Sequence, residues 1–172
     1  TLVNALEDHT ILKDLYIGAD LCNISMQRAI SIMLSHNRLQ QLSLRNSLQR
    51  AQDVSINTAW IVPTLQVNKS LKILDLSENS IDDAAFECLV DVFCTNSCLE
   101  EVRLHENRIS NIGAKLLGER LPTMRSIKRI FLHRNRFDEV GAEAILNGLR
   151  QNDEVEELTI PTMGRNMKMS KY

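Results

Sequence analysis

Apolar side chains recur every 28 residues along much of the chain. Three columns of such positions start at Leu71, Leu74 and Leu76 and continue to Val155, Leu158 and Ile160. Toward the N-terminus the pattern continues in units that begin at Leu12 and Leu39, and residues 2–6 match the second half of a unit. A fixed period of this length is the signature of a repeat architecture. We therefore predict an array of repeats that begins mid-unit.

Each unit divides into two halves with different periodicities. The first half, as in LKILDLSEN, alternates apolar and polar residues, which predicts a short strand. The second half, as in VGAEAILNGL, spaces its apolar residues as one face of a helix of about three turns. Strand, helix and strand at this spacing form a right-handed crossover into a parallel sheet. The predicted fold is an α/β solenoid with the sheet on its concave face and helices on its convex face.

The motif LxxLxLxxN, an apolar residue two places on and then GAxxL resembles the ribonuclease-inhibitor-like leucine-rich repeat. The resemblance covers about residues 1–160, and three units from Leu71 to Asn152 match it fully. That family includes ribonuclease inhibitor, ends of innate-immune receptors, tropomodulin-like actin regulators, ciliary proteins and a Ran GTPase-activating protein. The resemblance implies the fold and leaves the function open.

The second unit departs from the pattern. Ser47 occupies its asparagine slot, as Asp20 does in the first unit, and Pro63 falls inside the expected helix. Because proline lacks a backbone donor, we expect a kink or an early stop near Val62. Trp60 is either an aromatic anchor displayed on the convex side or a cover for this helix, as its column with Cys88 suggests.

The last unit opens with Val155 but shows no helical period after Pro161. We divide the chain into a repeat array over 1–160 and a C-terminal tail over 161–172. The array is expected to end on a bare strand or a truncation, and the tail to be a solvated terminus. Solenoids normally carry polar caps, so further repeats, another domain or a partner should cover both ends.

Residues between the repeated leucines should project from the concave face. They form two columns, Tyr16, Ser43, Asp75, Arg103, Phe131, Thr159 and Asp14, Gln41, Ile73, Glu101, Arg129, Glu157. Residues one repeat apart are lateral neighbours, so Arg129 should pair with Glu101 and Glu157, and Asp75 with Arg103. Exposed aromatic and arginine side chains are frequent anchors of protein interfaces. Tyr16, Asp75, Arg103, Arg129 and Phe131 are therefore candidate partner contacts.

A second candidate region lies just beyond the strands. His105 and His133 share one slot about 5 Å apart, with Arg134, Arg108 and Arg136 nearby. This cationic rim would suit an acidic partner surface, and His105, His133 and Arg134 join the candidate contacts. A zinc site needs three or four ligands, and only carboxylates such as Glu106 could complete one. We expect solvated histidines and no metal.

Two further sets of residues are predicted to be structural. Asn79, Asn107 and Asn135 share one slot, where an asparagine can satisfy the backbone of the loop between strand and helix. Cys88, Cys94 and Cys98 match no dependable zinc spacing, and we expect them to be buried reduced thiols.

Composition narrows the function. A formal net charge of -2 gives no footprint for nucleic acid or an anionic membrane. Four cysteines are too few for a disulfide scaffold and indicate a reducing, cytoplasmic setting.

We find no catalytic motif and expect no cofactor, so the first hypothesis is a non-catalytic module that binds another protein. Two alternatives remain. One is a Ran-directed GTPase-activating protein that would use Asn79, Asn107 or Arg134. The other is a structural segment of a cytoskeletal or ciliary assembly.

Overall fold

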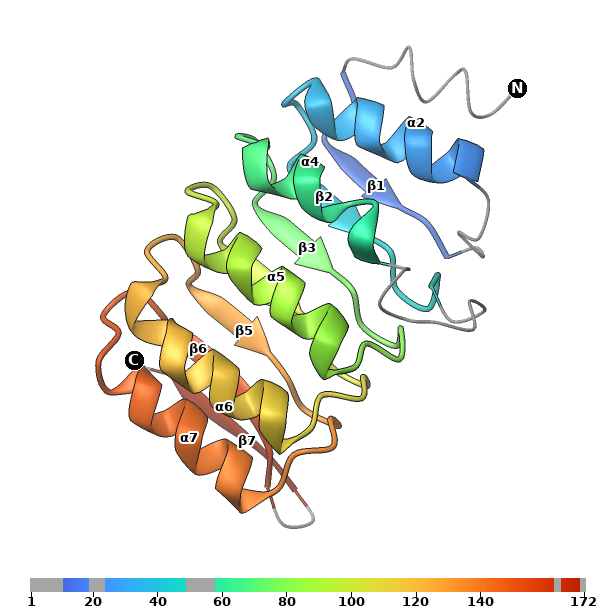
Figure 1. Cartoon of the computed structure of the whole chain (residues 1–172). Coiled ribbons are helices and arrows are strands. Elements are labelled where there is room, and N and C mark those ends of the chain that lie inside the picture. Colours follow the sequence, from blue (N-terminus) through green and yellow to red (C-terminus); the bar gives the residue numbers. More distant parts are fainter. Residues whose placement is uncertain (1–10, 19–23, 49–57, 163–164, 171–172) are drawn as a thin grey trace.

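A computed structural model describes residues 11–18, 24–48, 58–162 and 165–170. Its strands and helices alternate along the chain as far as β6 (Figure 1). In order they are β1 (Asp14–Tyr16), α2 (Ile24–Ser35), β2 (Gln41–Ser43), α4 (Val62–Val67), β3 (Ile73–Asp75), α5 (Asp83–Thr95), β4 (Glu101–Arg103), α6 (Asn111–Arg120), the 3-10 helix η1 (Leu121–Thr123), β5 (Arg129–Phe131), α7 (Glu139–Leu149), β6 (Glu157–Thr162) and β7 (Arg165–Ser170).

The described strands form one seven-stranded sheet in the order β1 to β7. Strands β1 to β6 are parallel, and each residue pairs with its counterpart in the next unit, as Leu74 does with Val102. Helices α2, α4, α5, α6 and α7 form a single layer on one face of this sheet (Figure 1). The predicted α/β repeat solenoid is confirmed.

The core lies between the helix layer and the sheet. All twelve members of the three apolar columns that begin at Leu71, Leu74 and Leu76 are at most 2% exposed. Helix residues such as Phe86, Leu89 and Ile145 close the core from the other side, and each is 1% exposed or less. Each unit thus buries its apolar residues against its neighbours, as the 28-residue period requires.

The asparagine column has the structural role that the sequence predicts. Asn107 Oδ1 accepts hydrogen bonds from the backbone N–H groups of Asn79 (3.0 Å) and Ile81 (2.9 Å). Its Nδ2 donates to the carbonyls of Leu76 and Leu104, both at 3.0 Å. Asn79 makes the same bonds to the preceding unit: its Oδ1 accepts the backbone N–H of Ser47, and its Nδ2 donates to the Leu44 carbonyl. Asn135 does so as well, accepting the N–H of Ile109 and donating to the Leu104 carbonyl.

The irregular second unit resolves one open question and confirms one expectation. Helix α4 begins at Val62, so Pro63 stands in its first turn, where a missing N–H breaks no helical bond. Residues 58–59 are also helical and residues 60–61 form a turn, so the expected stop near Val62 is present as a break between two helical segments. Trp60 is half-buried and packs against the core, which is the covering role rather than a displayed anchor.

The C-terminal segment differs from the expected solvated tail. Strand β6 continues to Thr162, and β7 pairs with it antiparallel, with Leu158 opposite Met169. Lys168 Nζ also bonds Glu157 Oε1 at 2.8 Å. The final repeat strand is consequently paired rather than bare. The expected mid-repeat start at residues 2–6 lies outside the described residues, as do Asp20 and Cys22.

Two further features concern membrane-spanning helices and thiols. No helix among the described residues is long and apolar enough to cross a membrane. Cys88, Cys94 and Cys98 are free thiols, as predicted. They are not buried, however, because Cys88 is exposed and the other two are half-buried on the helix side.

Candidate functional site

A buried carboxylate organises the centre of the sheet face opposite the helices. Glu101, on β4, is 5% exposed and accepts hydrogen bonds from two arginines. Arg103 bonds its Oε1 through Nε (2.6 Å) and Nη2 (2.5 Å), and Arg129 Nε bonds its Oε2 at 2.6 Å. Both arginine side chains keep about a third of their surface exposed, at 36% and 35%. One carboxylate thus fixes two outward-facing guanidinium groups.

The predicted charge pairs on this face are confirmed in part. Arg129 pairs with Glu101 as expected, but Arg103 bonds Glu101 instead of Asp75. The short Asp75 side chain is 6% exposed and accepts the backbone N–H of Ser77 at 3.0 Å. Glu157 turns to Lys168 on β7, a strand that the sequence did not predict. Asp75 is therefore too buried to be the exposed contact we expected.

The two aromatic candidates lie far apart. Phe131 is half-buried and directly opposite Arg103 in the β4–β5 register. Tyr16 is 63% exposed on β1, four strands from Phe131 in the same row. At roughly 4.8 Å per strand, this separation is about 19 Å. Phe131 consequently joins the two arginines in one cluster, and Tyr16 does not.

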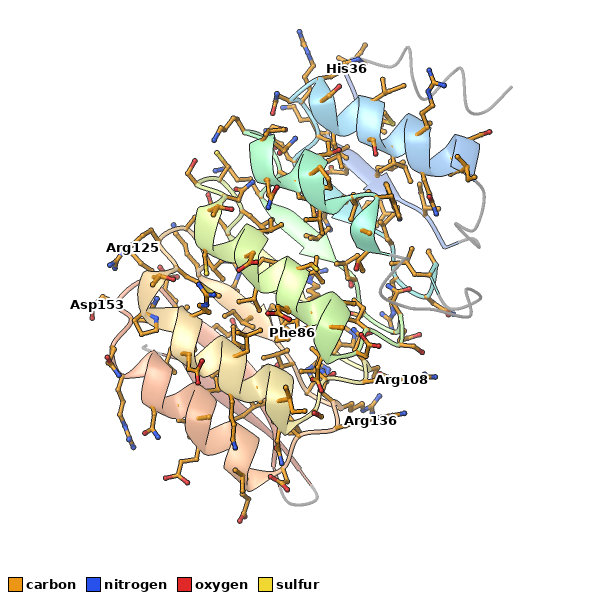
Figure 2. All side chains as sticks on the ribbon, in the orientation of Figure 1. His36, Phe86, Arg108, Arg125, Arg136 and Asp153 are labelled. Carbon is orange, nitrogen blue, oxygen red and sulfur yellow. The ribbon has the colours of Figure 1, made fainter. Side chains whose placement is uncertain are left out.

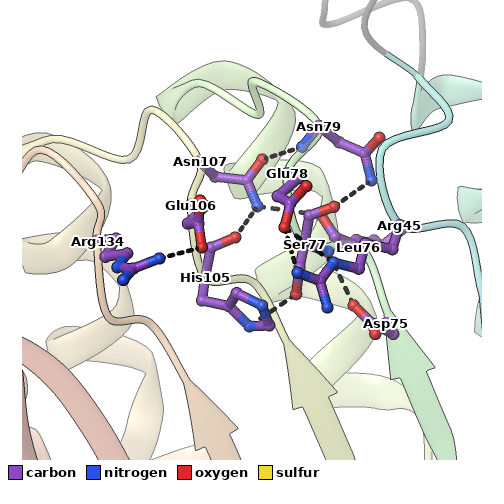
Figure 3. Close-up of polar contacts among 10 residues, drawn as sticks. All are labelled: Arg45, Asp75, Leu76, Ser77, Glu78, Asn79, His105, Glu106, Asn107 and Arg134. Carbon is purple, nitrogen blue, oxygen red and sulfur yellow. Dashed lines mark hydrogen bonds and ion pairs between the residues drawn. The ribbon is translucent and has the colours of Figure 1, made fainter.

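His105 and His133 stack on each other, as their shared slot predicts. Their ring centroids are 4.6 Å apart and their planes differ by 6°. His105 Nδ1 lies 2.8 Å from Ser77 Oγ (Figure 3), and His133 Nδ1 lies 3.1 Å from Thr159 Oγ1. Both rings are half-buried, so the expectation of solvated histidines is wrong.

Burial makes this histidine pair less cationic than the sequence indicates. Burial lowers the pKa of His105, and the adjacent His133 lowers it further. Burial also lowers the pKa of His133, with the Arg134 guanidinium contributing. The neutral form of both rings is therefore favoured near pH 7, and the rim takes its positive charge from arginines alone.

A ladder of four charged side chains borders the histidines, and the sequence analysis missed half of it. Arg45 pairs with Glu78, and Arg134 Nη1 bonds Glu106 at 2.7 Å (Figure 3). Glu78 and Glu106 share one slot, and both have a positive φ, 60° and 57°. Arg45 follows Leu44 as His105 follows Leu104, so this shared slot is the signal that could have identified it.

The same ladder bears on metal binding. Glu78, His105 and Glu106 could each offer a ligand atom within 4.8 Å of the other two. Both carboxylates are already bonded to arginines, and His105 Nδ1 is bonded to Ser77. An ion-pair ladder explains these residues without an ion.

The remaining rim arginines stand apart from this ladder. Arg108 and Arg136 extend from the loops that lead into the helices, on the opposite edge of the molecule from His36, Arg125 and Asp153 (Figure 2). Both are exposed. The sequence predicts a single cationic rim, but in the structure Arg134 is neutralised by Glu106 while Arg108 and Arg136 extend into solvent elsewhere. This division weakens the case for an acidic partner at the rim.

The histidine stack should make folding stability depend on pH. The folded-state pKa values of His105 and His133 lie below their unfolded values. The contribution of the pair to the free energy of unfolding is therefore fully present above about pH 6.5 and is lost as the pH falls below that value. In urea titrations from pH 7.5 to 5, the double variant His105→Gln/His133→Gln should lose this early decline. It should keep the acid-induced decline that carboxylates cause. An unchanged profile between pH 7 and 5.5 would contradict the prediction.

Comparison with known proteins agrees with this architecture. A family model described as "Leucine Rich repeat" matches residues 67–90 and 95–118. Among solved structures, the chain is similar to "Leiomodin-1 Actin-Binding Site 2 (ABS2)", with a TM-score of 0.67 and 15% identity over 81% of this chain and 80% of that one. It is also similar to a tropomodulin C-terminal domain of Caenorhabditis elegans, with a TM-score of 0.57 and 17% identity over 92% and 80% of the two chains. No curated protein sequence matches the chain.

These findings show two leucine-rich repeats, at residues 67–90 and 95–118, within a chain that has the leucine-rich repeat fold. The matched residues include strands β3 and β4. Strands β2 and β5 pair with them in the same parallel register, so the same structural unit recurs on both sides of the matched residues. The ribonuclease-inhibitor-like subtype stays a prediction.

Proposed function

We propose that the protein is a non-catalytic interaction module and that Arg103, Arg129 and Phe131 form the centre of its binding surface. The observation that carries this proposal is the arginine pair fixed by Glu101. Side chains that are already ordered lose less conformational entropy on binding. Phe131 adds a partly exposed aromatic ring beside them, and aromatic and arginine side chains are the commonest anchors of protein interfaces.

The proposal can be tested by affinity capture with the whole protein. The double variant Arg103→Ala/Phe131→Ala should lose at least about tenfold in affinity for its specific partners, equivalent to about 1.4 kcal/mol. Lys115→Ala, an exposed position on α6, is the matched control and should retain them. Partners that the double variant captures as well as the wild type does would refute this choice of surface.

Actin is the first partner to test, since one structural neighbour is named for an actin-binding site. Binding to actin would also agree with the alternative that the chain is a structural segment of a cytoskeletal assembly. Binding of purified actin by the wild type and Lys115→Ala, but not by Arg103→Ala/Phe131→Ala, would support both the partner and the surface. If the wild type does not bind, actin is rejected and the surface is still tested by affinity capture.

The GTPase-activating alternative has less support. Asn79 and Asn107 are 0% and 6% exposed, and their side-chain amides are hydrogen-bonded to backbone groups. Among the three residues suggested for it, only Arg134 is exposed, and it bonds Glu106. We also propose a cytoplasmic location, which the free thiols support.

A further inference from the structure

The edge at which the helices end carries a hollow that the proposed binding surface does not include. It has a volume of about 380 Å³. Segments before β1, after α2 and after α4 line it, and they bring Lys13, Arg38, Lys69 and Lys72 together. This volume falls within the range of pockets that bind organic ligands.

The hollow is a local concentration of positive charge. None of the described residues that line it is acidic. Lys72 Nζ bonds Glu100 Oε1, outside the lining, at 2.8 Å, whereas Lys13, Arg38 and Lys69 are exposed and have no ion pair among the described residues. Three cations without an ion pair in the described part of the chain thus share one depression, although the net charge of the whole chain is -2.

Hydrogen bonds between units hold the loops that carry these cations. Asn37 Oδ1 accepts the backbone N–H of Lys69 at 2.6 Å, and Asn37 itself has a φ of 52°. Ser70 Oγ donates to the Leu39 carbonyl at 2.8 Å. The N–H of Gln40 donates to the Lys13 carbonyl at 2.6 Å. The backbone around the hollow is therefore fixed, and only the cationic side chains need to adjust to a ligand.

We propose that this hollow binds an acidic peptide segment of a partner protein. Several cations distributed over three segments match a run of carboxylates better than one compact anion. Ile11 also lines the hollow and is 79% exposed, which places apolar surface beside the charges for a neighbouring side chain of the peptide. The hollow lies at the helix-end edge, away from the Arg103 and Phe131 surface, so the two proposals can fail independently.

The test measures binding of a fluorescein-labelled hexaglutamate peptide to the whole protein by fluorescence anisotropy. The wild type should bind the peptide, and binding should weaken as salt is raised. Arg38→Glu/Lys69→Glu should weaken it at least about tenfold. The matched control is Lys115→Glu/Arg125→Glu, which changes net charge equally. Arg125 occupies the slot of Lys69 two repeats on and lies on the same edge (Figure 2). This control should bind almost as the wild type does.

Three results would overturn the proposal. The first is absence of wild-type binding, and the second is an equal loss in the control, which would indicate general charge attraction. The third is binding to vesicles containing phosphatidylinositol phosphates without binding to the peptide, which would assign the hollow to a lipid headgroup. Circular dichroism of each variant checks folding, and the neutral pair Arg38→Ala/Lys69→Ala, with an intermediate loss expected, gives a second reading if the charge reversals disturb it.

Discussion

Replacement of Asn107 by alanine should lower the free energy of unfolding by about 3 to 5 kcal/mol. The side chain satisfies the N–H groups of Asn79 and Ile81 and the carbonyls of Leu76 and Leu104, and it is 6% exposed. Alanine offers none of these bonds, and each buried polar group left unpaired costs about 1 to 3 kcal/mol before local relaxation. Urea denaturation followed by circular dichroism measures the loss.

Asn147→Ala is the control for this prediction. Asn147 is exposed on α7 and its described bonds are to Arg150 and Gln151, so its removal should change stability by less than about 0.5 kcal/mol. Hydrogen exchange should place the Asn107→Ala loss first at the loops after β3 and β4, because each repeat depends directly on its neighbours. Equal stability of the two variants would show that water replaces the side chain of Asn107 at little cost.

Replacement of Gly148 by alanine should also destabilise the protein, by about 1 to 3 kcal/mol. Helices α6 and α7 approach closely where Gly118 faces Gly148. A Cβ on Gly148 would meet the backbone carbonyl of Gly118, and a Cβ on Gly118 would meet that of Ala144. Because backbone cannot move aside as a side chain can, the helices must separate. That cost should exceed the roughly 1 kcal/mol that alanine gains in helix propensity.

Gly18→Ala gives the matched control, since nothing lies within 4 Å of a Cβ at that position. It should change the thermal midpoint little, whereas Gly148→Ala should lower it by several degrees. A stabilised Gly148→Ala variant would mean that the α6–α7 spacing adjusts freely and that helix propensity decides the outcome.

The stacked histidines illustrate how far the sequence leads at the site. Their common slot predicts that the two rings are neighbours, and the centroid distance of 4.6 Å confirms it. Their charge could not be predicted in the same way. The pKa values depend on how far the two rings are buried and on their bonds to Ser77 and Thr159. The repeat spacing specifies neither.

The sequence by itself determined the repeat, the parallel register, the buried apolar columns and the structural asparagines. These features follow from periodicity, because each unit must bury the same positions against its neighbours. The tertiary structure alone decided the rest. It turned Arg103 to Glu101, paired Arg45 with Glu78 and placed β7 against β6. It also gathered the cations of the hollow. Such contacts depend on side-chain length and on departures from the period, and a repeating pattern contains neither.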